Sequence, residues 1–141
     1  MKDRIFIDTN IFVYSAVSDS HHAGRRQKAI ALIQAVDREI VISTQVLNEF
    51  SAILIKNGID NDAIQERVVE IIENTTVNAL TTDTILSAWE IRIKYKFSYW
   101  DSLIIASALE RNCSVLYTED LQDGQIIEKK LKTVNPFSEK P

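Results

Sequence analysis

Short β-rich runs alternate with longer helical stretches, and this alternation constrains the fold of the chain more than any other feature. The expected strands cover residues 4–8, 39–42, 76–80 and 114–118, with a further edge strand at 133–135. The expected helices cover residues 23–37, 44–57, 60–74, 83–96 and 100–112. Strands and helices in this order form a parallel sheet with helices on both faces. We therefore predict a three-layer α/β/α architecture with a central parallel sheet of four to five strands.

Length and composition favour a single domain that spans residues 1–141. Of the 141 residues, 45% are hydrophobic and 26% are charged, close to the average for a soluble domain. The three glycines and two prolines mark no linker, because Pro136 and Pro141 both lie near the C-terminus. Cys113 is the only cysteine, so neither a disulfide framework nor a cysteine-rich zinc site is expected. This cysteine usage suits a reducing compartment.

Neither a membrane segment nor an export signal is indicated. Asp8 and Asn10 interrupt the apolar start of the chain, and no stretch approaches the roughly 20 apolar residues of a membrane span. The formal net charge of -4 does not favour binding of nucleic acid by bulk electrostatics, although acids confined to a metal pocket would contribute to that total. We expect a soluble, cytoplasmic protein.

Four acidic residues occupy positions that a parallel α/β fold brings to one edge of its sheet. Asp8 ends the first expected strand, and Asp120 follows the strand at 114–118. Glu49 lies on the helix after the second strand, and Asp101 opens another helix. Ligands of open parallel sheets bind at the carboxyl ends of the strands. Crowded carboxylates repel one another, so a hard cation usually neutralises them. We therefore predict a site for Mg²⁺ or Mn²⁺ formed by these four acids.

The two helices that carry Glu49 and Asp101 are expected to hold them against the core. Glu49 lies beside an apolar stripe on the helix at 44–57, formed by Val46, Leu47, Phe50, Ile53 and Leu54. Its carboxylate is therefore expected to point toward the sheet, where leaving it unpaired would be costly. The helix at 100–112 is apolar almost all round, which anchors Asp101 at its start.

Further polar residues next to the acids are expected to orient the carboxylates or to hold a phosphate oxygen; they are Thr9, Asn10, Ser43, Thr44 and, as an accessory acid, Asp123. A metal ion in such a site lowers the pKa of a bound water and stabilises charge on the leaving oxygen. No serine or cysteine nucleophile is then needed. The pattern suits hydrolysis of a phosphodiester bond.

In order, spacing and local context, these acids resemble those of the PIN domain family, most closely its VapC-type toxins. Residues 8–10, Asp-Thr-Asn, are similar to the family's first-strand Asp followed by a small hydroxyl residue and Asn. Residues 48–50, Asn-Glu-Phe, match the context of its helical Glu. Asp101 follows an aromatic residue and opens a helix rich in small residues, and Asp120 lies in a Thr-Glu-Asp-Leu run. The resemblance covers nearly the whole chain.

This resemblance implies a PIN-like fold and a Mg²⁺- or Mn²⁺-dependent endoribonuclease with Asp8, Glu49, Asp101 and Asp120 as its catalytic residues. It also implies a homodimer that cuts structured RNA such as transfer or ribosomal RNA, and a cognate antitoxin that silences it. On physical grounds, the hydrophobic residues near the site are expected to offer a docking groove for such a partner; they are Ile11, Phe12, Val13 and Tyr14.

Each acid also has a structural interpretation. Asp8 and Asp120 are suited to capping a helical turn, and Asp123 begins an ordinary turn dipeptide. Residues 98–101 match a capping box, and Glu49 is able to form a salt bridge. The occurrence of all four acids in this order favours the catalytic interpretation.

Two other functions compete with the nuclease. A catalytically silent PIN-like module would bind RNA or protein without chemistry. A phosphohydrolase is disfavoured, because a dehalogenase-like site needs an Asp at the position of Asn10.

Other residues that could contact RNA have a simpler interpretation. For His21 and His22, a solvated loop and helix start is favoured over a contact with phosphate. For Tyr99 and Trp100, a position in the core or at an interface is favoured over stacking on a base.

Overall fold

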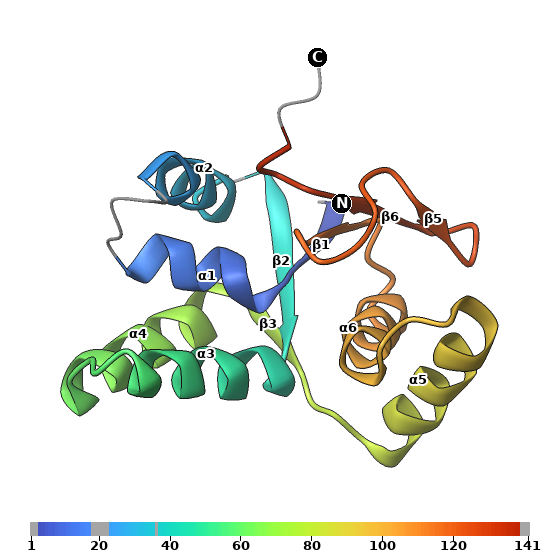
Figure 1. The fold of residues 1–141 in the computed structure, drawn as a ribbon, viewed down its shortest axis with the longest axis horizontal. Helices are drawn as coiled ribbons and strands as arrows, with labels where there is room; N and C mark the ends of the chain where they lie inside the picture. The colour runs from blue at the N-terminus through green and yellow to red at the C-terminus, as the bar shows by residue number, and fades with distance from the viewer. Residues whose placement is uncertain (1–2, 18–22, 36, 139–141) are drawn as a thin grey trace.

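Helices cover both faces of a central β-sheet in the computed structural model, which describes residues 3–17, 23–35 and 37–138 (Figure 1). The strands in these residues are β1 (Asp3–Ile7), β2 (Arg38–Ser43), β3 (Thr76–Asn78), β4 (Val115–Tyr117), β5 (Ile126–Ile127) and β6 (Leu131–Val134). The helices are α1 (Thr9–Ala16), α2 (Ala23–Ile33), α3 (Thr44–Lys56), α4 (Asn61–Asn74), α5 (Thr82–Tyr95) and α6 (Tyr99–Glu110). Figure 1 shows α1 to α4 on one side of the sheet and α5 with α6 on the other.

The strand order is β3-β2-β1-β4-β6-β5. The first five of these strands are parallel, and β5 pairs antiparallel with β6. Thus the predicted three-layer architecture and parallel sheet are confirmed, with six strands in the described residues instead of four to five. Strand β1 lies between β2 and β4, so the direction in which strands are added reverses beside its carboxyl end. This is the place where open α/β sheets bind ligands.

The C-terminal part of the sheet differs from the prediction. The strand expected at the edge, at 133–135, is β6, and it lies inside the sheet between β4 and β5. The edge strand β5 was not predicted, because two residues are too few for a periodic pattern. The turn that follows it has Glu128 and Lys129 at positive φ, a conformation that the sequence does not signal with a glycine.

Helix α1 was also not predicted, and it changes the interpretation of the apolar run after Asp8. Ile11 and Phe12 are buried in the core, while Val13 and Tyr14 are half-buried. Most of this run therefore belongs to the core, but Phe12 also lines a groove between α1, α2 and α4, so the expectation of a docking groove stays a prediction. A short apolar run suits a strand or a helix equally well, and only its packing decides between them. His21 and His22 lie outside the described residues.

The core fixes the elements that carry the predicted site. Val46, Phe50 and Leu54 of α3 are buried, as the stripe predicted, and α6 is buried from Ser102 to Ala108. Burial of one large apolar side chain contributes about 1.5–3 kcal/mol, so these helices are firmly held. Burial also raises the pKa of the Cys113 thiol to about 12, which keeps it neutral. None of the described helices is long and apolar enough to cross a membrane.

Candidate metal centre and active site

Four elements bring the predicted acids to the carboxyl edge of the sheet. Asp8 follows β1, Glu49 lies in the second turn of α3, Asp101 lies in the first turn of α6, and Asp120 follows β4. The pKa of Asp120 is raised by burial and by the negative charges of Asp101, Glu119 and Glu49. The pKa of Asp8 is raised mainly by burial and further by the charges of Asp120 and Glu49. These shared electrostatic effects show that the acids form one cluster.

Asp8 is the most deeply placed acid of the cluster, with 7% of its surface exposed. It caps α1, since its Oδ1 accepts the Thr9 N–H at 2.7 Å. Its Oδ2 accepts the Thr118 hydroxyl at 2.9 Å. Both hydrogen bonds favour the carboxylate, but burial outweighs them and raises the pKa of Asp8 to about 6.

Glu49 is held at both carboxylate oxygens. Its Oε2 accepts the Thr9 hydroxyl at 2.9 Å, and its Oε1 accepts the Gln45 Nε2–H at 2.9 Å. Gln45 also donates to the carbonyl oxygen of Trp100 at 3.2 Å. Because both partners of Gln45 are acceptors, they fix which end of its amide faces them. Thr9 thus links α1 to α3, and Gln45 links α3 to the start of α6.

Asp101 and Asp120 keep their carboxylates available. Ser98 Oγ accepts the Asp101 N–H at 3.1 Å, which is one half of the predicted capping box. Asp120 donates its N–H to Thr118 Oγ1 at 3.1 Å. Among the described residues, neither carboxylate takes part in a hydrogen bond. These two side chains are therefore free to turn toward a ligand.

The other polar residues that the sequence indicated have different surroundings. Thr44 Oγ1 accepts the Leu80 N–H at 3.2 Å, and Asp123 Oδ1 accepts the Asn135 N–H at 2.9 Å, so both hold neighbouring segments of the chain. Ser43 is fully buried, and its hydroxyl has no partner among the described residues. The Asn10 side chain is half-buried and makes no hydrogen bond within the described part of the chain. Of the five residues, Thr9 bonds to the acids: its N–H donates to Asp8 and its hydroxyl to Glu49.

Two residues that hold the acids were missed by the sequence reasoning. Gln45 precedes Glu49 by four residues, and this spacing on a helix was a usable signal. Thr118 uses its single hydroxyl to donate to Asp8 and to accept from Asp120. Its importance depends on a contact across 110 residues, which no local pattern reveals.

The donor set suits a hard divalent cation, because carboxylate oxygens are the ligands that Mg²⁺ and Mn²⁺ prefer. Burial, and after it the negative charges of neighbouring acids, raise the pKa of Asp8 and of Asp120, and a bound cation would offset both effects. Within residues 3–17, 23–35 and 37–138, however, no three His, Cys, Asp or Glu side chains converge closely enough to hold a metal ion. The acids are gathered at one edge without a closed ligand set.

A groove of about 610 Å³ lies apart from the four acids, none of which lines it. Its walls come from α1, α2, the start of β2 and the second half of α4. Apolar side chains such as Ile30 and Ile71 line it together with three arginines, Arg26, Arg38 and Arg67. Glu70, which pairs with Arg67, also lines it, so the lining mixes apolar, basic and acidic side chains.

A comparison with protein families decides the classification. A model of the PIN domain matches residues 5–123, which include all four acids. The chain belongs to the PIN domain family. The resemblance that the acidic motifs indicated is thereby confirmed.

The fold of this PIN domain is similar to solved structures of toxins. VapC20 from Mycobacterium tuberculosis, described as a toxin that cleaves the sarcin-ricin loop, has 21% identity and a TM-score of 0.68, covering 82% of this chain and 89% of that chain. A toxin-antitoxin complex from Klebsiella pneumoniae has 19% identity and a TM-score of 0.71; the match covers 94% of this chain and 98% of that chain. VapBC2 from Rickettsia felis, bound to a promoter DNA fragment, has 19% identity and a TM-score of 0.59; the match covers 94% of this chain and 99% of that chain. At identities this low, the TM-scores show a shared fold and nothing more. No protein with a curated description matches the chain significantly.

Proposed function

We propose that this PIN domain is a metal-dependent endoribonuclease and the cytoplasmic toxin of a VapBC-type toxin-antitoxin pair. The observation that carries the proposal is the cluster of Asp8, Glu49, Asp101 and Asp120 at the carboxyl edge of the sheet, where each of the four acids takes part in the charge interactions. Membership of the PIN domain family and the folds shared with toxins support it.

In this proposal the four carboxylates hold Mg²⁺ or Mn²⁺, which when bound lowers the pKa of a water and stabilises charge on the leaving oxygen. The residues of the chain prepare the site. The Thr9 hydroxyl keeps Glu49 directed at the edge, and the Thr118 hydroxyl joins Asp8 to the backbone of Asp120. Because the pKa of Asp8 is about 6, its carboxyl is mostly ionised, and able to act as a ligand, above that pH.

The substrate proposed is structured RNA such as transfer or ribosomal RNA. An antitoxin protein is the partner proposed to restrain the enzyme, because an unrestrained nuclease endangers its own cell. The groove between α1, α2 and α4, with apolar side chains and three arginines beside one acid, Glu70, offers a surface for an amphipathic, acidic segment of such a partner. Slower growth on expression of the chain, relieved by its partner, would support the toxin assignment; unaffected growth would overturn it and leave the nuclease assignment standing.

A homodimer is also part of the proposal, and an apolar face on α5 supports it. Leu86 and Ile93 of this helix are 63% and 74% exposed, and Ile85 and Trp89 lie on the same side of it. Exposed apolar clusters of this kind are typical of protein interfaces.

A catalytically silent PIN-like module remains the alternative, and a phosphohydrolase is a weaker one. The retention of all four acids argues against a silent module, because a site without chemistry would tolerate their loss.

Cleavage of total RNA by the purified protein tests the nuclease. The reactions contain Mn²⁺ or EDTA, and fragment ends are read by sequencing. Asp101→Asn is expected to lower cleavage at least about 100-fold, since loss of even an outer partner of a metal site costs about 10- to 100-fold. Asp83→Asn is the matched control. Asp83 lies in the first turn of α5, as Asp101 lies in the first turn of α6, but Asp83 is exposed and is not one of the four acids.

Discrete cuts that disappear with EDTA and with Asp101→Asn, but persist with Asp83→Asn, would support the proposal. Undiminished cleavage by Asp101→Asn would contradict the assigned site. If the wild type bound Mn²⁺ but did not cut RNA, the silent module would be favoured.

A further inference from the structure

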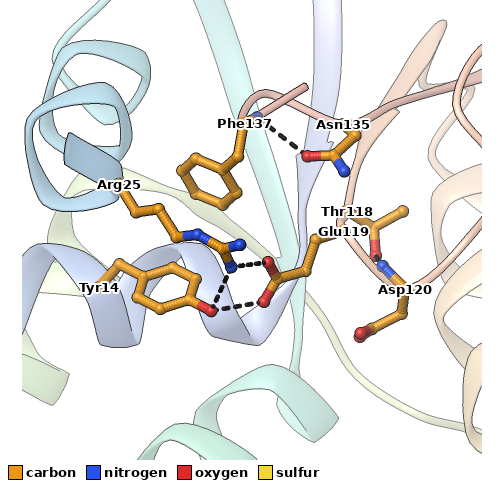
Figure 2. Close-up of polar contacts among 7 residues, drawn as sticks. All are labelled: Tyr14, Arg25, Thr118, Glu119, Asp120, Asn135 and Phe137. Atoms are coloured by element: carbon orange, nitrogen blue, oxygen red, sulfur yellow. Dashed lines mark hydrogen bonds and ion pairs between the residues drawn. The ribbon is translucent and has the colours of Figure 1, made fainter. Parts of the chain in front are cut away.

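A network of charged and aromatic side chains lies beside Asp120 and is not part of the acidic cluster (Figure 2). Arg25 of α2 donates from Nη1 to Glu119 Oε2 at 2.6 Å and to the Tyr14 hydroxyl at 3.0 Å. Tyr14 of α1 in turn donates its hydroxyl to Glu119 Oε1 at 2.7 Å. Both carboxylate oxygens of Glu119, the residue directly before Asp120, are therefore held by the two N-terminal helices.

Aromatic rings hold the guanidinium of Arg25 in place. Its central carbon lies 5.5 Å from the ring centroid of Tyr14 and 5.4 Å from that of Phe137. The two rings meet edge to face at 5.2 Å. Phe137 is fixed in turn, because its N–H donates to Asn135 Oδ1 at 2.9 Å, and the Asn135 N–H donates to Asp123. We call the group of Tyr14, Arg25, Glu119 and Phe137 the Arg25 clasp.

The contacts of the clasp are stronger than those of an ordinary surface ion pair. The Glu119 side chain is only 16% exposed, and each of the three hydrogen bonds in the clasp has a charged group, Arg25 or Glu119, as donor or acceptor. Arginine suits this position because its planar guanidinium donates in fixed directions and stacks on rings, whereas a lysine is a single point charge. The clasp therefore holds one geometry.

The position of the Asp120 side chain depends on the contacts of the two residues before it, Thr118 and Glu119. The Asp120 carboxylate has no hydrogen bond among the described residues, and its N–H is bound only by Thr118. Thr118 is anchored to Asp8 on the inner side of the segment 118–120. The clasp anchors Glu119, whose side chain points toward Tyr14 and Arg25 in Figure 2 while that of Asp120 points away from them. Residue 119 is thus the second of two fixed points for the backbone of Asp120.

We propose that the Arg25 clasp is a positioning device for Asp120: by holding Glu119, it fixes the segment 118–120 so that the Asp120 carboxylate faces the other acids. This inference rests on the proposed function, because it takes Asp120 as a metal ligand. Tyr14, Arg25 and Glu119 are positioning residues that act through the backbone of Asp120.

Two measurements on the full chain test the clasp. The first is the metal-free ¹H–¹⁵N spectrum of residues 118–120, and the second is the affinity for Mn²⁺ by calorimetry. Arg25→Met is expected to shift the amide resonances of Glu119 and Asp120 and to weaken Mn²⁺ binding about tenfold, the scale on which outer partners affect metal sites. Arg25→Lys, which keeps the charge, is expected to recover part of the affinity.

Lys28→Met is the matched control, because Lys28 lies exposed on the same helix and the substitution removes the same charge. It is expected to change neither readout. Tyr14→Phe provides a milder second variant, because it removes one hydroxyl and keeps the ring contact with Arg25. Thermal unfolding of every variant verifies that it is folded.

The outcomes separate the clasp from the nuclease proposal. Unchanged amide resonances in Arg25→Met and Tyr14→Phe would overturn the clasp. Shifted resonances with wild-type Mn²⁺ affinity would overturn it as a device for the metal site. A wild type that binds no Mn²⁺ would overturn the proposed function, and the role of the clasp with it. Perturbed resonances together with weakened binding, absent from Lys28→Met, would support it.

Discussion

At the scale of single residues, the placement of Asp8 is costly for the fold. Burial raises the pKa of Asp8 from 3.8 to about 6 in the folded protein. A carboxyl whose pKa is raised by folding destabilises the folded state when it is ionised. The cost is absent below about pH 3.8, develops as the pH rises to about 6, and is complete above that pH. Such a cost to stability is typical of a carboxylate whose charge serves a function, such as binding a metal ion.

Asp8→Asn is therefore expected to stabilise the metal-free protein at pH 7.5 by about 1–2 kcal/mol. The raised pKa corresponds to about 3 kcal/mol, and the amide gives back part of it because its nitrogen cannot accept the second hydrogen bond of Asp8. The gain should vanish near pH 4, where the native carboxyl is protonated. Urea unfolding in EDTA at both pH values measures it, with Asp83→Asn as the exposed control. Lower stability of Asp8→Asn at pH 7.5 would contradict this account.

Gln45 is buried on α3, with 5% of its surface exposed, so its replacement is expected to lower stability. Gln45→Leu leaves Glu49 Oε1 and the Trp100 carbonyl without their donor, and loss of a buried partner costs about 1–3 kcal/mol. Gln65→Leu, at an exposed position of α4, is expected to change stability by no more than about 0.5 kcal/mol. The free energy of unfolding in urea distinguishes the two. Equal effects of the two substitutions would show that the hydrogen bonds of Gln45, which join α3 to α6, contribute nothing to the free energy of unfolding.

At the scale of elements, α5 and α6 differ although they pack on each other. Helix α6 is buried along almost its whole length, so it is a rigid support for Asp101. Helix α5 covers it and leaves large apolar side chains on its outer face. Apolar faces of this kind are typical of contacts with another molecule. The homodimer proposed above would use it.

Ile93→Glu is accordingly expected to convert the dimer into a monomer, because a charge would be buried in the apolar contact. Ile55→Glu is the control, since Ile55 of α3 is similarly exposed, at 62%. Size-exclusion chromatography with light scattering gives the mass of each variant. A dimer that tolerates Ile93→Glu would place the interface elsewhere, and dissociation by both variants would make the effect non-specific.

At the scale of the whole molecule, the four acids join elements that are far apart in the sequence. A cation that binds them would hold α1, α3, α6 and the segment after β4 together. A ligand that binds only the folded state stabilises it by mass action. Metal binding and folding should therefore be linked in this protein.

Addition of Mn²⁺ at about 100 times its dissociation constant is expected to stabilise the wild type by about 2.7 kcal/mol. Thermal unfolding with and without the metal gives the shift. Asp120→Asn should lose most of the shift, because it removes one ligand charge, while Asp83→Asn should retain all of it. A shift that Asp120→Asn leaves intact would mean that the stabilising metal binds elsewhere.

Features that depend on residues close together in the chain could be predicted from the sequence. The apolar stripe of α3, the buried character of α6 and the alternation of strands and helices all follow from local periodicity. The four acids were found for the same reason, since each lies at a recognisable boundary or beside an apolar stripe. Their roles as metal ligands remain a prediction.

Contacts between side chains far apart in the chain emerged only from the folded structure. Thr118 bonds Asp8 across 110 residues, and Arg25 bonds Glu119 across 94. The burial of α1 and the internal position of β6 depend in the same way on which faces pack together. Local sequence specifies the conformation of a segment, whereas these contacts depend on the sheet order and on shared burial, which no single segment encodes.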